Sequence, residues 1–163
     1  MFDANEIFNL FDKQWALVTA GTAQSFNTMT VSWGGLGTLW SLPVATVYVR
    51  PSRYTHDLME REALFTVSFY GEEHRKELAI LGRYSGRDCD KVGMTELTPK
   101  AVETTLGQTM TFAEAELTLV CRKIYARDMD KALISPVVAE RHYEPDEPAH
   151  TAYIGEVIDI LRR

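Results

Sequence analysis

Residues 27–35, NTMTVSWGG, alternate small polar side chains with apolar ones and then reach two glycines. Hydroxyls take one side of this alternation and apolar side chains the other: Thr28, Thr30 and Ser32 against Met29, Val31 and Trp33. A period of two is typical of a β-strand. The segment therefore predicts a strand whose hydroxyl face and glycine end can receive a flat ligand, or, as the alternative, an edge strand with its polar face in solvent.

Further runs rich in Val, Thr and aromatic residues indicate strands at residues 15–19, 44–49, 64–69, 115–124 and 152–161. Helical patterns fall at residues 55–61, 72–84 and 129–133. Strands and helices do not alternate regularly, so we expect a mainly antiparallel β-barrel with a few peripheral helices. No repeat or linker divides the chain, and residues 1–163 are expected to form one domain.

Composition excludes several classes of protein. The chain has 163 residues, with 17 basic residues against 23 acidic ones and a net charge of -6, which argues against nucleic-acid and anionic-membrane partners. Cys89 and Cys121 lack metal or disulfide spacing, which is typical of reduced thiols. The first 15 residues mix acidic and apolar side chains, unlike a signal peptide, so we expect a cytoplasmic protein.

The segment RPSRYT, residues 50–55, has the chemistry of an anion site. Arg50 and Arg53 can hold phosphate oxygens, Ser52 and Thr55 add hydroxyls, and a helix that begins here, capped by Thr55, presents free N–H groups. The alternative is that Thr55 only caps this helix while the arginines pair with surface carboxylates such as Asp57 or Glu60.

Two more polar segments are candidates for ligand contact. Residues 84–91, YSGRDCDK, form either a loop over an anionic or planar ligand or a helix end with a glycine cap, and His150 stands just before the last strand. Other classes of site are excluded by their missing motifs. The chain has no dinucleotide or P-loop glycine pattern, no HExxH, no other spacing of metal ligands and no GxSxG, so we expect neither a metal site nor a nucleophilic serine.

In their order and spacing, these segments resemble the flavin reductase-like family of FMN-binding split barrels, which includes the flavoredoxins. The resemblance runs over nearly the whole chain, through NTMTVSWG, RPSRYT, FTVSFYG, SGRDCDK and the terminal HTAYIGEV. It implies a six-stranded antiparallel split barrel that forms a homodimer, with one FMN per barrel near the subunit interface. It also implies that a reduced nicotinamide, NAD(P)H, passes hydride to the flavin, and that the flavin then reduces a second acceptor.

The resemblance also assigns roles to residues. The flavin ring would lie among Asn27, Met29, Thr30, Ser32 and Trp33, and its phosphate and ribityl chain among Arg50, Ser52, Arg53, Tyr54 and Thr55. Ser85, Gly86 and Lys91 would contact flavin or substrate, and His150 would face the reactive side of the ring as a proton donor. Ala149 stands where many members carry an acidic residue, which leaves nicotinamide use open. Two alternatives therefore stay: a flavoredoxin-type carrier reduced by a redox protein partner, and a non-enzymatic module that binds another phosphorylated or planar ligand.

Overall fold

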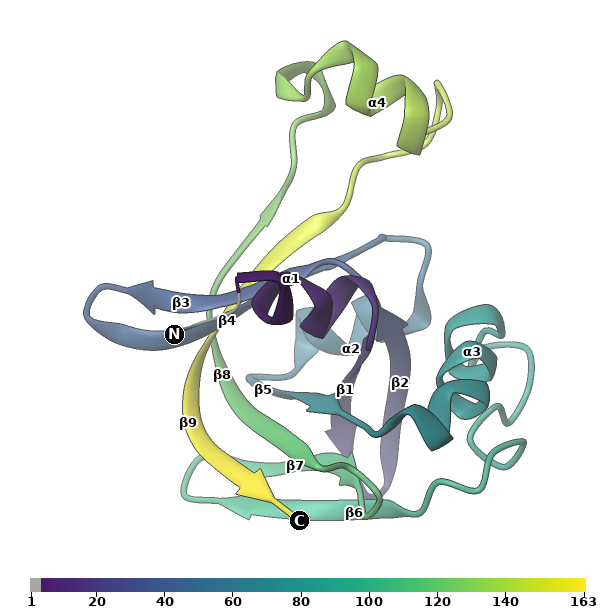
Figure 1. Ribbon diagram of the computed structural model, residues 1–163, viewed down its shortest axis with the longest axis vertical. Coiled ribbons are helices and arrows are strands. Elements are labelled where there is room, and N and C mark those ends of the chain that lie inside the picture. Colours follow the sequence, from purple (N-terminus) through teal and green to yellow (C-terminus); the bar gives the residue numbers. More distant parts are fainter. Residues whose placement is uncertain (1–3) are drawn as a thin grey trace.

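Seven antiparallel strands form the main sheet of the computed structural model, which describes residues 4–163 (Figure 1). Their order across the sheet is β2-β1-β5-β8-β9-β4-β3. The bounds are β1 Ala16–Thr22, β2 Ser25–Val31, β3 Gly34–Leu39, β4 Leu42–Val49, β5 Leu64–Phe69, β8 Leu117–Asp128 and β9 Thr151–Arg162. A separate hairpin of β6 (Pro99–Thr104) and β7 (Gly107–Phe112) packs through β7 against β1 and β5.

The mainly antiparallel β architecture is confirmed, but the sheet has seven strands where six were expected. The additional strand β3 is rich in glycine and mostly exposed, so it lacks the apolar alternation that marks the other strands. It pairs with β4 through a tight turn at Trp40 and Ser41, whose φ angles of 51° and 61° are the left-handed values that two-residue hairpin turns require. The hairpin β6–β7 also lay outside the predicted strands.

Short helices surround the sheet: α1 Ala4–Asp12, α2 Tyr54–Arg61, α3 Arg75–Arg83 and α4 Pro136–His142, with 3-10 turns at Glu72–His74 and Lys131–Leu133. The three predicted helical segments are present within a few residues of their expected bounds. Helices α1 and α4 were not predicted, and α1 is held by Phe11, whose ring meets Phe69 edge-on at 5.4 Å. In the described part of the chain, no helix is long and apolar enough to cross a membrane.

Two clusters of buried apolar side chains form the core. The larger lies inside the curved sheet and includes the fully buried Phe65 and Tyr153. Gly155 of β9 is needed there, because a Cβ atom at this position would lie 2.5 Å from the Phe65 ring and 2.7 Å from Cys121. The smaller cluster joins α3 to β1 and β7, through residues Leu17, Leu78, Leu81 and Phe112.

Strand β8 runs on past its pairing with β5 and stays paired with β9, and the segment between β8 and β9 projects as an arm (Figure 1). We define this arm as residues 129–150, between the paired residues Asp128 and Thr151. Its helix α4 has no buried residue, and Leu133 is 85% exposed. The arm is therefore held mainly by contacts near its base, where the candidate site lies.

Candidate functional site

Strand register brings the two most distant site segments together. Val49 of β4 pairs with Thr151 of β9, so Arg50 directly follows one strand where His150 directly precedes the other. A pocket of about 230 Å³ opens at this point, and strand β2 forms a further wall. These predicted site residues line it: Met29, Thr30, Ser32, Trp33, Arg50, Arg53 and His150.

Three other lining residues were not among the predicted site residues: Val31, Tyr48 and Gly82. Tyr48 lies two residues before Arg50 on β4, and Gly82 lies in the last turn of α3. Their place in the pocket depends on how β4 and α3 pack against β2, which no local pattern encodes. A polar alternation around Tyr48 is the one signal that was available in the sequence.

Two cations near one end of the pocket have no counter-charge: Arg53 lines the pocket, and Lys91 lines a neighbouring hollow. The Arg53 guanidinium donates to the carbonyl of Gly82 at 2.6 Å, and the Lys91 ammonium, only 3% exposed, donates to the carbonyl of Leu81 at 2.9 Å. Burial, followed by the charge of Arg50, lowers the pKa of Arg53, while burial and Arg53 lower the pKa of Lys91 to about 8. No carboxylate of the described residues pairs with either cation.

These contacts also have a structural role, because they satisfy the free carbonyls at the C-terminal end of α3. Thr30 adds a third contact to this helix, donating to the carbonyl of Leu78 at 2.5 Å. However, each carbonyl takes only one proton from cations that carry several. The remaining donors of Arg53 and Lys91 are then available to an anion.

Arg50 differs from these two cations because it is already paired. It forms an ion pair with Glu147 and donates to the carbonyl of His142 at 3.1 Å. The two partners named from the sequence are engaged elsewhere: Asp57 pairs with Arg87 at 2.5 Å, and Glu60 accepts from the Tyr153 hydroxyl at 2.5 Å. Arg87 also donates to the carbonyl of Ser52 at 2.9 Å. The interpretation that the arginines of RPSRYT bind carboxylates is thus correct for Arg50 and not for Arg53.

The opposite end of the pocket is aromatic. The rings of Trp33 and His150 lie 5.0 Å apart, and Nδ1 of His150 shares a 2.7 Å hydrogen bond with the hydroxyl of Tyr143. Burial, then the charge of Arg50, lowers the pKa of His150 to about 4. The imidazole is therefore neutral at pH 7 and can contribute hydrogen bonds there without carrying a charge.

Four other predicted residues line a neighbouring hollow of about 480 Å³: Asn27, Tyr54, Gly86 and Lys91. Asn27 donates to the hydroxyl of Thr55 at 2.9 Å. A Cβ atom at Gly86 would lie 2.2 Å from Oδ1 of the Asn27 side-chain amide, so the loop packs directly against this side chain of β2. Lys91 in the wall of this hollow lies close enough to Arg53 of the first pocket to feel its charge, so the two cavities are neighbours.

Three predicted residues line neither cavity. Thr55 was expected to cap a helix, but α2 begins at Tyr54 and its N-cap is Arg53, so Thr55 lies inside the first turn, fully buried. That expectation was wrong because the Thr55 hydroxyl accepts from Asn27 instead. The side chain of Ser85 accepts from the backbone N–H of Arg87 at 3.2 Å, and Ser52 is exposed.

Comparison with solved structures shows the same fold at low sequence identity. Flavoredoxin from Methanosarcina acetivorans matches with a TM-score of 0.71 and 21% identity, covering 92% of this chain and 68% of that one. An FMN-binding protein from Thermus thermophilus, solved with bound p-hydroxybenzaldehyde, matches with a TM-score of 0.68 and 17% identity, covering 91% and 71%. Nitrilotriacetate monooxygenase component B from Bacillus cereus matches with a TM-score of 0.68 and 16% identity, covering 98% and 76%.

Curated proteins provide no match to this sequence. The sequence model described as "Flavin reductase like domain" matches residues 8–163, which is nearly all of the chain. This match covers every strand of the sheet and every segment on which the resemblance was based. The fold is accordingly a split barrel, and the chain belongs to the flavin reductase-like domain family.

Proposed function

We propose that this protein binds FMN and transfers hydride from NAD(P)H through it to a second acceptor. The observation that carries the proposal is the polarity of the site: Arg53 lines one end of the pocket without a carboxylate partner, with Lys91 in the adjoining hollow, and a hydroxyl-bearing strand with an aromatic wall lies at the other end. A phosphorylated flat molecule matches this arrangement, since its phosphate compensates the cations and its ring packs against the wall.

The residues present fit FMN. Arg53 and Lys91 would hold the phosphate, with Ser52, Tyr54 and Thr55 around the phosphate and ribityl chain. Thr30, Ser32 and the backbone of Met29 would border the ring, with Trp33 beside it; Asn27, Ser85 and Gly86 would form the adjoining loop wall. Arg50 would contribute little net charge to the phosphate site, because Glu147 already neutralises it; its main contribution would be to form part of the pocket wall.

When bound, FMN supplies the capacity to accept and release hydride. The chain's own contribution is to bind and orient it. Backbone N–H groups along β2 and the neutral His150 would provide donors beside the ring, as preorganised groups do for developing negative charge. Because the pKa of His150 is low, its ring is neutral at pH 7. Any proton that His150 donates would therefore come from the N–H of the neutral ring.

We also propose a homodimer in the cytoplasm, formed by a single domain over residues 1–163. Exposed apolar side chains on the β3–β4 hairpin support self-association: Leu36 is 44% exposed and Trp40 is 64% exposed. Light scattering of the purified protein would give a mass near twice 18.5 kDa if this is correct.

The decisive experiment is the visible spectrum of the purified protein, before and after NADPH or NADH is added without oxygen. Flavin bands that bleach with either nucleotide would support the reductase. Bands that persist with nucleotide but bleach with a reduced iron–sulfur protein would favour the second candidate, an electron carrier; the similarity in fold to a flavoredoxin is what favours that candidate. A colourless protein that does not bind added FMN would refute both and leave a module for another ligand.

A further inference from the structure

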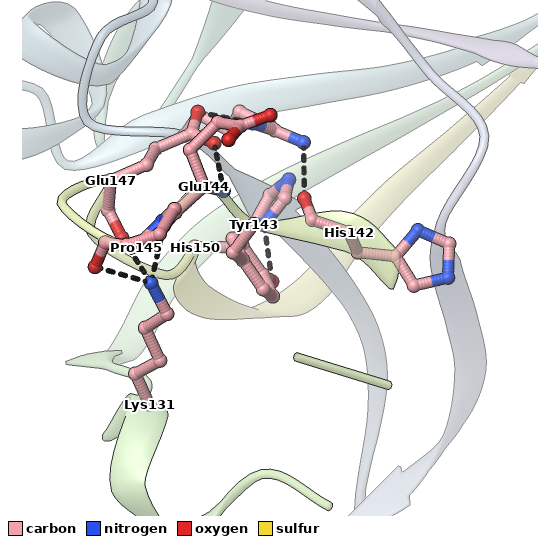
Figure 2. A network of polar contacts seen from close by, with 8 residues as sticks. Lys131, His142, Tyr143, Glu144, Pro145, Glu147 and His150 are labelled. Carbon is pink, nitrogen blue, oxygen red and sulfur yellow. Dashed lines mark hydrogen bonds and ion pairs between the residues drawn. The ribbon is translucent and has the colours of Figure 1, made fainter. Parts of the chain in front are cut away.

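We propose that Tyr143 of the arm is a positioning residue for His150, because its hydroxyl donates to Nδ1 and thereby keeps the single ring proton on Nε2. The Tyr143 oxygen lies 2.7 Å from Nδ1 of His150, and Figure 2 draws this contact. Which nitrogen of a neutral imidazole carries the proton is set by the hydrogen bond that the other nitrogen makes. The inference rests on the proposed function only for the ligand that Nε2 meets.

The second ring nitrogen, Nε2, is open to the cavity that His150 lines. Among the described residues, no hydrogen bond engages Nε2. The described side-chain atoms that are fully buried without a partner belong to Tyr70, Glu77 and Thr109, so Nε2 is accessible. Because His150 forms part of the wall of the main pocket, a proton on Nε2 is available to a ligand there.

The distance and the chemistry of the two groups make the tyrosine hydroxyl the donor. An N–H donor usually lies about 2.9–3.0 Å from its acceptor, whereas a hydroxyl donor comes to about 2.7–2.8 Å. The observed separation of 2.7 Å therefore fits a hydroxyl donor. A phenol is also a much stronger acid than a neutral imidazole, and an imidazole nitrogen accepts a proton more readily than a phenol oxygen does.

Charges around the pair favour the same arrangement. The Arg50 guanidinium carbon lies 5.5 Å from the centre of the Tyr143 ring, and the Lys131 ammonium lies 6.0 Å from it. Positive charge near the ring strengthens the hydroxyl as a donor, because it stabilises the negative charge that develops on the oxygen. Burial and the charge of Arg50 lower the pKa of His150 to about 4 despite the opposing charge of Glu147, so the imidazole carries one proton at pH 7.

Tyr143 is itself held by the chain on both sides of it. It directly follows α4, and its backbone N–H donates to the carbonyl of Ala139 at 2.9 Å. Arg50 binds the carbonyl of the preceding residue, His142, and Lys131 donates to the carbonyls of the loop that follows (Figure 2). The hydroxyl therefore has a fixed place from which to orient the imidazole.

His150 depends on this one contact for the place of its proton. Among the described residues, Tyr143 is the only hydrogen-bond partner of the His150 side chain, and the preceding Ala149 is buried and has no polar side-chain group. Without the tyrosine hydroxyl, the ring proton can occupy either nitrogen. A ligand would then meet a donor in one tautomer and an acceptor in the other.

Nitrogen NMR of the flavin-free protein tests the assignment, because protonated and unprotonated ring nitrogens have widely separated chemical shifts. We expect Nε2 of His150 to carry the proton in the unaltered protein, and Tyr143→Phe to move both ring nitrogens toward intermediate shifts. His150→Phe identifies the signals. Tyr125→Phe is the matched control and should leave them unchanged, because Tyr125 is 43% exposed and its hydroxyl makes no hydrogen bond among the described residues.

The midpoint potential of bound FMN tests the consequence. A neutral N–H donor beside the ring favours the reduced form, which carries more negative charge. Loss of one neutral hydrogen bond changes this preference by about threefold to tenfold, which for two electrons lowers the potential by about 14–30 mV. Tyr143→Phe should show this shift, whereas adding Tyr143→Phe to His150→Phe should cause no further change, since Tyr143 acts only through His150.

A proton on Nδ1 in the unaltered protein, ring-nitrogen shifts that Tyr143→Phe leaves unchanged, or an unchanged potential in that variant would overturn the proposal. Thermal melting would verify that the variants are folded, and the shifts of the unaltered protein do not depend on them. A protein that binds no FMN would reject the proposed function, while the nitrogen shifts would still decide the role of Tyr143.

Discussion

Replacing Arg53 by Gln tests the anion site at its most informative position. The arginine is half-buried, lines the main pocket and makes one hydrogen bond, to the carbonyl of Gly82, that glutamine can partly retain. The substitution therefore removes a charge and leaves the packing nearly unchanged. Arg83→Gln is the matched control, because Arg83 ends α3, the helix whose Gly82 carbonyl Arg53 binds, but is exposed and lines none of the described pockets.

The magnitude follows from the hydrogen bonds. Arg53 has five N–H donors and its described contact uses one, so at least one charge-assisted bond to a phosphate oxygen is available. Such a bond contributes about 1.5–3 kcal/mol, and 1.4 kcal/mol corresponds to a tenfold change in affinity. We therefore expect Arg53→Gln to weaken FMN binding by roughly 10-fold to 100-fold, and Arg83→Gln to leave it within twofold.

Riboflavin, which lacks the phosphate, makes the assay specific. Quenching of flavin fluorescence gives the affinity of each protein for FMN and for riboflavin. If Arg53 binds the phosphate, the unaltered protein prefers FMN and the variant largely loses that preference, while both bind riboflavin alike. An equal loss of affinity for both flavins would show that Arg53 supports the pocket only by holding α3, and unchanged FMN affinity would refute the reasoning entirely.

Three further predictions concern stability. Burial lowers the pKa of Lys91 to about 8, so between pH 8 and 10.5 only the unfolded chain holds this proton; the free energy of unfolding should rise with pH across that window, and less so in Lys91→Met, as measured by denaturant titration. The pKa of His150, lowered to about 4, gives stability that is complete above pH 6.5 and is lost as pH falls from 6.5 to 4; His150→Phe should flatten that part of the curve, and an unchanged slope would contradict the burial argument. Gly155→Ala should cost about 1–3 kcal/mol and lower the melting temperature, because the added methyl meets Phe65, whereas Gly35→Ala, with no atom within 4 Å, should leave it unchanged.

Much of the fold was accessible from sequence because its signals are local. Period-two alternation and turn residues predicted strands that the sheet contains, including β5 with its bounds Leu64–Phe69. The glycine-rich strand β3 escaped because it buries almost nothing, and α1 because it depends on the packing of Phe11 against Phe69. Helix α1 is stabilised by a partner distant in the chain, and β3 by its pairing with the following strand β4, rather than by their own patterns.

The sequence by itself determined the chemical character of the candidate site: a basic, hydroxyl-bearing segment, a polar strand and a histidine before the last strand. Only the tertiary structure decided how these groups are used. Strand register sets Arg50 against Glu147, 97 residues away, and so neutralises it, while Arg53 stays without a carboxylate among the described residues. Within the arm, Tyr143 hydrogen-bonds His150, and residues of the arm and Trp33 line one cleft. Charge and periodicity are properties of neighbouring residues, but the partner of a charge is fixed by the packing of the whole chain.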